Sequence, residues 1–332
     1  MKDKLIIISA IALFGCASCE TDPHKSPEEP VKSDVIIPAF NPDSAYLFVK
    51  HQVDFGPRVP NSAEHEACAN YLVQKLESFG ANVIVQEAVV KGYDGTRLNM
   101  KNIIGQFFPE NKRRIMLYAH WDTRPWADRD PDPANWHTPI DGANDGASGV
   151  AVLLEIARHF QEFPPDHGID IIFFDAEDYG TPEFASSSGG ETTWCLGSQY
   201  WAANPHEQGY RAKFGVLLDM VGGKTASFPK EGTSMYYADY IVEKIWKAAK
   251  KTGHSKFFTN DVSGATTDDH RFVNEIAGIP SACIVEYHTN VQIMGLQGYG
   301  DYHHTHKDNM DVISAETLGA VGEVLQHVIY LE

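Results

Sequence analysis

Two neighbouring acids, Glu177 and Asp178, lie just after an apolar run and are the first residues that could do chemistry. The run, 171–174, is rich in β-branched and aromatic residues, which is typical of a buried strand in an α/β sheet. Such sheets bind ligands at the carboxyl ends of their strands, where successive side chains point in opposite directions. One acid can therefore face a metal ion while its neighbour faces a substrate. A solvated acidic turn is the alternative.

Two other segments carry groups that bind metals. The glycine-rich segment 141–149 offers Asp145, and it lacks the GxGxxG spacing and the lysine of phosphate-binding loops. It is either a turn with an N-cap acid or a carboxylate held by tight backbone turns. The loop 302–309 has three histidines within four residues. Asp145, one acid of the strand end and one loop histidine would supply two carboxylates and an imidazole, which suits a catalytic zinc site with one open position.

Strands and helices alternate along the chain, which predicts an α/β fold with a mostly parallel sheet flanked by helices. An antiparallel pair near the start of the sheet fits the same pattern. Acids and histidines follow several predicted strands, at 120–122, 177–178, 219 and 286–288. The predicted strands are 83–85, 102–107, 115–119, 169–175, 214–219 and 281–285, and the predicted helices are 61–79, 147–163, 195–203, 235–251 and 315–331.

The N-terminus predicts export and a lipid anchor. Lys2 and Lys4 precede the apolar run 5–14, which is short for a membrane span and typical of a signal peptide over 1–15. The sequence Leu-Phe-Gly-Cys at 13–16 resembles a lipoprotein box, so we expect Cys16 to be acylated; ordinary secretion is the alternative. Residues 16–34 then form the anchor and a disordered tether, and 35–332 form a single catalytic domain.

The net charge limits the possible binding partners, and the number of cysteines limits the possible disulfides and metal sites. The formal net charge of −18 argues against nucleic acid, and against an anionic membrane surface apart from the lipid anchor. Cys68, Cys195 and Cys283 are an odd number with no zinc-finger spacing, so we expect buried free thiols.

Six motifs in order resemble the zinc exopeptidase superfamily and, within it, the bacterial branch of the glutaminyl cyclases. They are His-Trp-Asp at 120–122, Gly-Ala-Asn-Asp at 142–145, Phe-Phe-Asp-Ala-Glu-Asp at 173–178, Leu-Leu-Asp-Met-Val-Gly at 217–222, Asp-Asp-His at 268–270 and His-Thr at 304–305. The resemblance covers about 44–331. It implies a single-domain three-layer sandwich. Aminopeptidase relatives usually have Ser-Asp-His where this chain has 268–270, so the added acid favours the cyclase.

The resemblance also implies roles for individual residues. Asp145, Asp178 and His304 would bind one zinc ion, and Glu177 would shuttle the proton while N-terminal glutamine becomes pyroglutamate with loss of ammonia. Asp219 and Asp268 would form a carboxylate network that orients the substrate, and Trp194 would line its binding site. Asp178 stands where a glutamate is common, and His303 stands where animal cyclases have tryptophan. An aromatic entrance is expected, with the candidates Trp121, Trp126, Trp136, Trp194 and Tyr302. For each single residue, ordinary packing is favoured over contact with the substrate.

Two other functions stay open. Because His120 and Asp219 complete a potential two-metal set, an aminopeptidase with two zinc ions is the runner-up. A peptide-binding lipoprotein without catalysis is the third hypothesis. For the main hypothesis we expect a monomer that acts on peptides or proteins with N-terminal glutamine. We place it at the periplasmic side of a bacterial cell envelope, anchored through Cys16.

Overall fold

The structure is a computed structural model that describes residues 35–186, 189–290 and 298–332. The compact unit that carries the candidate site spans Ile36–Glu332. The predicted signal peptide, the anchor at Cys16 and the tether to residue 34 lie outside the described residues. Among the helices that are described, none is long and apolar enough to cross a membrane.

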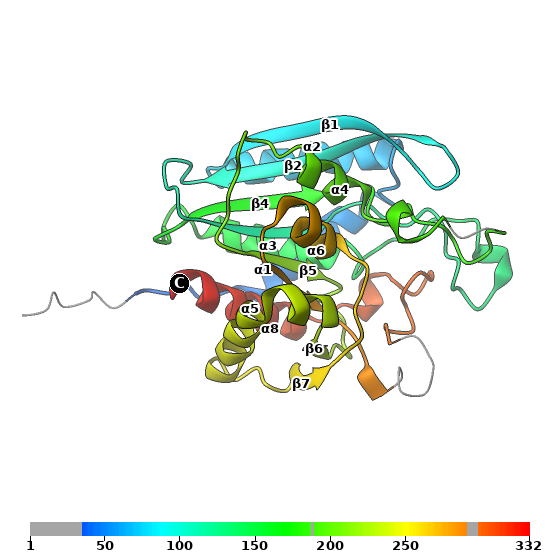
Figure 1. Cartoon of the computed structure of the whole chain (residues 1–332). Coiled ribbons are helices and arrows are strands. Elements are labelled where there is room, and N and C mark those ends of the chain that lie inside the picture. The colour runs from blue at the N-terminus through cyan, green and yellow to red at the C-terminus, as the bar shows by residue number, and fades with distance from the viewer. Residues whose placement is uncertain (1–34, 187–188, 291–297) are drawn as a thin grey trace, which may run out of the picture. The chain divides into compact units, whose positions relative to one another are not determined.

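A mixed sheet forms the centre of this unit (Figure 1). In spatial order its strands are β1 (Asn82–Lys91), β2 (Arg97–Phe107), β4 (Gly168–Phe174), β3 (Arg114–His120), β5 (Gly215–Asp219) and β8 (Ser281–Val285). β2 pairs antiparallel with β1 and β4, whereas β4, β3, β5 and β8 run parallel. The parallel strands are buried along their whole length, because helices cover both faces. The predicted mostly parallel sheet with an antiparallel start is confirmed.

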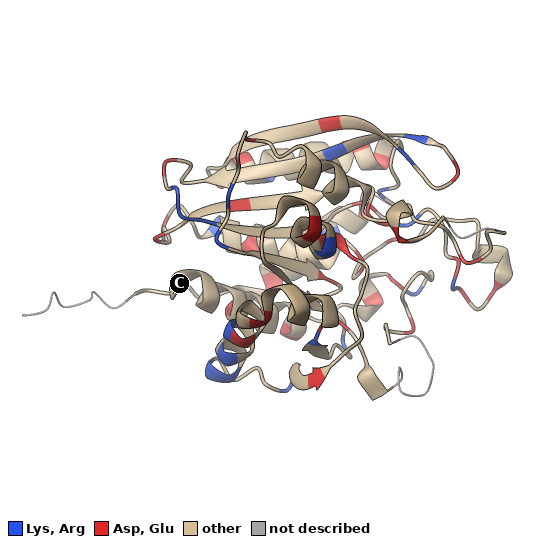
Figure 2. Cartoon of the chain, viewed as in Figure 1, with Lys and Arg blue, Asp and Glu red and all other residues tan. Residues whose placement is uncertain are grey.

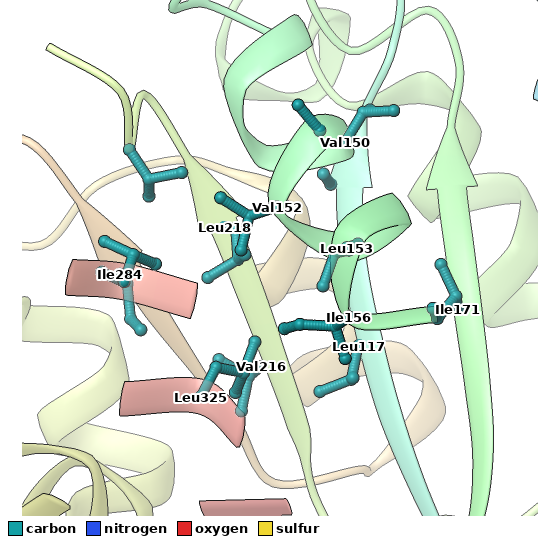
Figure 3. Packing of buried hydrophobic residues seen from close by; sticks show 14 of the residues in the cluster. Leu117, Val150, Val152, Leu153, Ile156, Ile171, Val216, Leu218, Ile284 and Leu325 are labelled. Atoms are coloured by element: carbon teal, nitrogen blue, oxygen red, sulfur yellow. The ribbon is translucent and has the colours of Figure 1, made fainter. Parts of the chain in front are cut away.

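Helices pack on the two faces of the sheet as separate layers. α1 (Pro42–Val53), α2 (Ala63–Ser78), α3 (Ala147–Arg158), α5 (Gly232–Lys251) and α8 (Ala315–Tyr330) share the larger core with strand residues such as Leu117 and Ile171 (Figure 3). α4 (Leu196–Ala203) and the short π-helix η3 (Val273–Ala277) pack on the opposite face of the sheet. They contact the alternate strand residues that point to that face, such as Met116 and Ile172. Since alternate residues of a strand face opposite sides, the result is the predicted three-layer sandwich.

The start of α3 approaches the sheet unusually closely. A Cβ atom at Gly149 would lie 2.2 Å from the carbonyl oxygen of Leu218 and 2.9 Å from the Cβ atom of Ala119. Only glycine fits between these atoms, so the sequence lets α3 lie directly on β5 and β3. The turn before α3 is thereby held at the carboxyl ends of these strands, and this turn carries Asp145.

Several short elements were not predicted from the sequence. They are α1, the parallel pair β6 (Phe228–Lys230) and β7 (Phe258–Val262), α6 (Asp269–Phe272), and the 3₁₀ helices η1 (Pro133–Asn135), η2 (Glu191–Thr193) and η4 (Met310–Val312). α3 ends at Arg158 and not at 163, because the chain turns at 159–163 before two consecutive prolines. Cys68, Cys195 and Cys283 are buried and free, as expected. Charged residues are sparse in the central strands and more frequent on the helices and loops (Figure 2).

Candidate active site

The carboxyl ends of β3, β4 and β5 meet at one edge of the sheet, because these strands are parallel neighbours. A cavity of about 510 Å³ opens at this edge. It is lined by all the residues predicted to be catalytic, substrate-binding or metal-binding, which are Asp145, Glu177, Asp178, Trp194, Asp219, Asp268 and His304. Glu286, at the end of β8, does not line the cavity; it is buried and accepts a hydrogen bond from the Tyr302 hydroxyl at 2.6 Å.

Asp145, Asp178 and His304 face one another in the cavity. Nε2 of His304 lies 3.3 Å from Oδ1 of Asp178 and 3.7 Å from Oδ2 of Asp145. Burial, together with the charges of Arg124 and Arg129, holds the pKa of His304 well below its usual range. The imidazole is therefore neutral, which is the form that binds metals. Although the side chain of Asp178 is shorter than the glutamate common at this position, its carboxylate still reaches His304.

The carboxylate of Asp178 indicates that a cation belongs here. Its Oδ2 atom is buried without a hydrogen-bond partner among the described residues. Burial raises the pKa of Asp178 to about 7, although the charge of Arg124 lowers it. An unpaired carboxylate oxygen in the interior is costly, and a bound cation would satisfy it. The two carboxylates of Asp145 and Asp178 and the neutral imidazole of His304 have the donor chemistry that zinc prefers. Asp145 and His304 also form, with His303, a group whose ligand atoms all lie within 4.8 Å of one another.

Supporting residues that the sequence analysis missed hold this group in place. Arg124 donates to the backbone oxygen of Asp178 at 3.0 Å and makes a bidentate pair with Asp128 at 2.6 and 2.7 Å. Nδ1 of His304 lies 3.7 Å from Oδ1 of Asp128. Asp128 is thus placed behind the histidine, where a carboxylate can orient a ligand imidazole. The four-residue spacing of Arg124 and Asp128 was the only signal in the sequence.

The turn that carries Asp145 is fixed by a buried acid, Asp308. Its carboxylate accepts hydrogen bonds from the backbone nitrogens of Asn144 at 2.7 Å and Asp145 at 3.0 Å. Burial, and next the charge of Asp145, raise the pKa of Asp308 to about 8. Arg58 donates to the backbone oxygen of Gly142 at 2.8 Å. Asp308 belongs to the histidine-rich loop, but its type and position alone did not distinguish it from a surface acid.

Two more histidines lie beside Asp145. Nε2 of His120 is 3.0 Å from Oδ1 of Asp145 and 3.3 Å from Oδ1 of Asp219, so these side chains form a second group able to hold a cation. Burial lowers the pKa of His120, but its acidic neighbours raise it well above the usual range. His303 lies 3.7 Å from Oδ2 of Asp145 through Nε2, while its Nδ1 accepts a hydrogen bond from Arg129 at 2.6 Å.

Glu177 lines the cavity next to Asp178 and is held at several points. Its Oε1 atom accepts a hydrogen bond from the thiol of Cys195 at 3.0 Å, and its backbone nitrogen donates to Asp122 at 3.1 Å. Burial raises the pKa of Glu177 well above its usual range. A carboxyl group with a raised pKa that faces a cavity can accept and return a proton near neutral pH.

Asp219 and Asp268 both line the cavity, but the structure places no hydrogen bond between them. Asp219 instead approaches His120, and Asp268 accepts a hydrogen bond from the backbone nitrogen of Asp269 at 2.6 Å. Burial, and next the charge of Asp219, raise the pKa of Asp268 to about 6. The two acids interact through their charges, and the hydrogen-bonded carboxylate network that the resemblance implies stays a prediction.

Glu231 is a buried acid that positions the segment carrying Asp268. It accepts hydrogen bonds from the backbone nitrogens of Ser234 at 2.7 Å and Thr266 at 2.8 Å, and it lies 2.9 Å from Nε2 of His270. It thus ties the start of α5 to the loop before α6. Glu231 was not predicted as a functional residue. It is the N-cap of α5, and its only signal in the sequence is an acid shortly before the predicted helix 235–251.

Trp194 is the only predicted entrance aromatic that lines the cavity in the described part of the chain. Its ring stacks on His304 with centroids 5.9 Å apart, and Cζ of Arg124 lies 4.6 Å from its centroid. The entrance prediction is wrong for Trp121 and Tyr302, which are buried in the core. It is also wrong for Trp126 and Trp136, which are half-buried outside the cavity. These four aromatic side chains pack against other parts of the protein, because burial of a large ring stabilises the fold.

We expect the Glu231→Gln variant to lose about 3 kcal/mol of unfolding free energy at pH 6, because it leaves His270 without its buried partner. Hydrogen bonds from His270 and backbone nitrogens, opposed by burial, hold the pKa of Glu231 well below its usual range. The carboxylate thus stabilises the fold above the pKa of the unfolded chain, about 4.3, and this contribution falls as the pH drops below that value.

Urea unfolding at pH 6, 4 and 3 measures the effect. The difference between wild type and Glu231→Gln should shrink by up to about 1.4 kcal/mol per pH unit below pH 4. The matched control is Glu243→Gln on the same helix, since Glu243 pairs with Lys230 at the surface and should change stability by less than about 1 kcal/mol. A difference that stays constant with pH would contradict the assignment.

Comparisons with known proteins show the family and the fold. The model of the family "Peptidase family M28" matches residues 102–329. The crystal structure of Bacteroides thetaiotaomicron glutaminyl cyclase bound to N-acetylhistamine is 56% identical, covers 90% of this chain and 100% of that chain, and has a TM-score of 0.87. A Zn-dependent exopeptidase from Parabacteroides distasonis is 53% identical with the same coverage and a TM-score of 0.87.

A more distant curated relative is the aminopeptidase YwaD of Bacillus subtilis, which is 26% identical over 292 residues. The alignment covers 86% of this chain but 56% of YwaD, so the chain spans little more than half the length of that relative. The matched family model covers most of the chain, including the turn of Asp145, the strand end at 177–178 and the loop of His304. The chain belongs to peptidase family M28.

Proposed function

We propose that the protein is a glutaminyl-peptide cyclotransferase, which converts the N-terminal glutamine of peptides or proteins to pyroglutamate and releases ammonia. The likeness to the B. thetaiotaomicron glutaminyl cyclase along the full length of that chain carries the proposal. The cavity supports it, because a metal-binding group, a proton-carrying acid and two further acids line the same space. No side chain in this set needs to become covalently attached to the substrate.

Asp145, Asp178 and His304 would hold one zinc ion in this cavity. When bound, zinc supplies a Lewis acid for the side-chain amide carbonyl of the substrate glutamine and for the negative charge that develops on its oxygen. The orphaned Oδ2 atom of Asp178 and the neutral imidazole of His304 support this ligand set. His303 is a weaker ligand candidate, since Arg129 already occupies one of its ring nitrogens.

Glu177 moves the proton in the proposed reaction. The substrate α-amine, whose pKa is near 7.7 to 8, attacks the carbon of its own side-chain amide. Glu177 accepts a proton from this amine and donates it to the amide nitrogen. One carbon–nitrogen bond forms, one breaks, and ammonia leaves. Because the attack is intramolecular, the protein mainly fixes a reactive rotamer and exchanges protons.

Asp219, Asp268 and Trp194 would position the substrate. The two acids line the same cavity as His304 and can accept hydrogen bonds from the substrate amide or amine. Trp194 offers an indole face beside His304 and the cavity. Each of these three residues would help to orient the flexible glutamine side chain of the substrate.

An aminopeptidase with two metal ions is the second candidate. The observation in its favour is the group formed by His120, Asp145 and Asp219, whose ligand atoms lie within 4.8 Å of one another. This group shares Asp145 with the proposed zinc ligands. The second candidate would hydrolyse a peptide bond and release a free amino acid.

We propose in addition that the mature protein is a monomeric lipoprotein at the periplasmic side of a bacterial cell envelope. The support comes from the sequence alone: two lysines, the apolar run 5–14 and Cys16 at the end of a lipoprotein box. Residues 16–34 would tether the catalytic domain 35–332 to the membrane.

One assay separates these functions. Purified protein is incubated with a peptide that starts with glutamine, and the peptide products, ammonia and zinc content are measured. We expect a product lighter by one ammonia, with one zinc ion per chain. Free glutamine with two zinc ions would support the aminopeptidase, and an unchanged peptide would support a binding protein without catalysis.

The variant Glu177→Gln should retain zinc and lose at least about a hundredfold in kcat, because glutamine cannot carry the proton. Zinc content and the rate of ammonia release measure the two effects. The matched control is Glu183→Gln, since Glu183 lines the same cavity but is exposed and paired with Arg129. Activity within about tenfold of the parent would remove Glu177 from the proton-transfer role.

The thiol of Cys195 should affect the rate of the reaction indirectly, because it donates a hydrogen bond to Glu177. We expect Cys195→Ala to lower kcat by about tenfold with little change in KM, since Glu177 loses a hydrogen-bond donor that orients it. Cys195→Ser keeps a donor and should recover most of the loss. The control is Cys68→Ala, a buried free cysteine in α2 away from the cavity. Equal losses in the alanine and serine variants would contradict a role for the hydrogen bond.

A further inference from the structure

A second cavity lies beside the active cavity and shares part of its wall. Its volume is about 440 Å³, and we call it the side cavity. Glu191 and Thr267 line both cavities. Thr267 precedes Asp268, one of the acids of the active cavity. A ligand seated in the active cavity can therefore continue into the side cavity without leaving the protein surface.

The boundary between the two cavities is made of side chains that can rearrange. Arg271 forms an ion pair with Glu191 and donates a hydrogen bond to the hydroxyl of Thr267 at 3.0 Å. Both charged side chains are partly or largely exposed, and such pairs hold little free energy. A peptide that passes between the cavities needs to displace only this exposed contact.

The outer wall of the side cavity is aromatic and carries excess negative charge. Tyr236 is 81% exposed and Tyr237 is 38% exposed, and their rings lie 4.7 Å apart. Such exposed aromatic rings beside a cavity are more typical of binding sites than of ordinary surface. Glu191 and Glu275 line the cavity with a single cation, Arg271. Arg271 pairs with both glutamates, so these three side chains carry a net charge of −1. Aromatic faces beside a net negative charge favour a cationic guest.

The side cavity is fixed relative to the active cavity. The hydroxyl of Thr233 donates to the backbone oxygen of Thr266 at 3.1 Å, and Glu231 binds backbone nitrogens of both segments. The start of α5, which carries the tyrosines, is thereby tied to the loop that carries Thr267 and Asp268. A substrate held in both places would bind to a preorganised surface.

We propose that the side cavity is a substrate subsite that takes a lysine or arginine side chain one or two residues after the N-terminal glutamine. This inference rests on the proposed function, since it assumes that a peptide with N-terminal glutamine occupies the active cavity. The glutamine enters the active cavity, the chain leaves past Glu191 and Thr267, and the cationic side chain lies against Tyr236 and Tyr237.

Steady-state kinetics with four amidated peptides test the subsite: Gln-Ala-Ala, Gln-Lys-Ala, Gln-Ala-Lys and Gln-Ala-Phe. We expect kcat/KM for one lysine peptide to exceed that for Gln-Ala-Ala by about fivefold, mainly through KM. In Tyr236→Ala this ratio should fall to about one, because the aromatic face is lost. Tyr240→Ala is the matched control, since Tyr240 is an exposed tyrosine of α5 that does not line the side cavity.

Three outcomes would overturn the inference: no preference for lysine, a preference that survives in Tyr236→Ala, or a stronger preference for phenylalanine. The same ratios can be measured as binding constants by calorimetry in the Glu177→Gln background, where the peptides are not turned over. Pyroglutamate formation from Gln-Ala-Ala without a lysine preference would leave the proposed function standing and reject the subsite. Lysine-dependent binding without pyroglutamate would reject the proposed function and keep the subsite.

Discussion

Repulsion between buried carboxylates is the constraint on which the rest of this structure depends. Acids from separate segments meet at one edge of the sheet: Asp145, Glu177, Asp178, Asp219, Asp268 and Asp269. Burial raises the pKa of each of these groups, and the charges of nearby carboxylates raise it further. A fold that gathers them loses stability unless cations or hydrogen-bond donors compensate. The same repulsion makes the edge ready to bind a divalent cation and to exchange protons.

The groups that hold the cavity residues in place do so from the surrounding protein, through hydrogen bonds to their backbone. Asp122 accepts hydrogen bonds from the backbone nitrogens of Glu177 and Asp178, both at 3.1 Å, and so fixes the turn after β4. The backbone is also strained around the cavity, where Ala176 and His304 have φ angles of 53° and 58°. Left-handed backbone at non-glycine residues costs about 1 kcal/mol or more, and such strain persists where packing and hydrogen bonds on every side enforce it. The cavity therefore draws its geometry from the surrounding core.

Sequence reasoning located the cavity because its residues stand at the ends of strongly apolar strands. The strand pattern predicted which edge of the sheet would carry Glu177 and Asp219, and the motifs supplied Asp145 and His304. Buried partners such as Glu231 escaped notice, because a single acid before a helix has the same pattern whether it caps that helix or ties several segments together. Likewise, the sequence could not tell that Trp121 packs against His65, with ring centroids 4.3 Å apart, whereas Trp194 faces the cavity. Such differences depend on contacts between segments far apart in the chain.

The number of cations that the edge holds depends on His120. Its Nε2 atom lies 3.0 Å from Oδ1 of Asp145 and 3.3 Å from Oδ1 of Asp219, so a second cation in this group would compete with the imidazole for these carboxylates. The neighbouring acids favour the protonated imidazole, which places a positive charge where that cation would lie. Either a protonated His120 or a second metal ion could therefore compensate the negative charge of the neighbouring carboxylates. A protonated His120 would relieve this repulsion without a second metal ion, and the proposed cyclisation consumes no water.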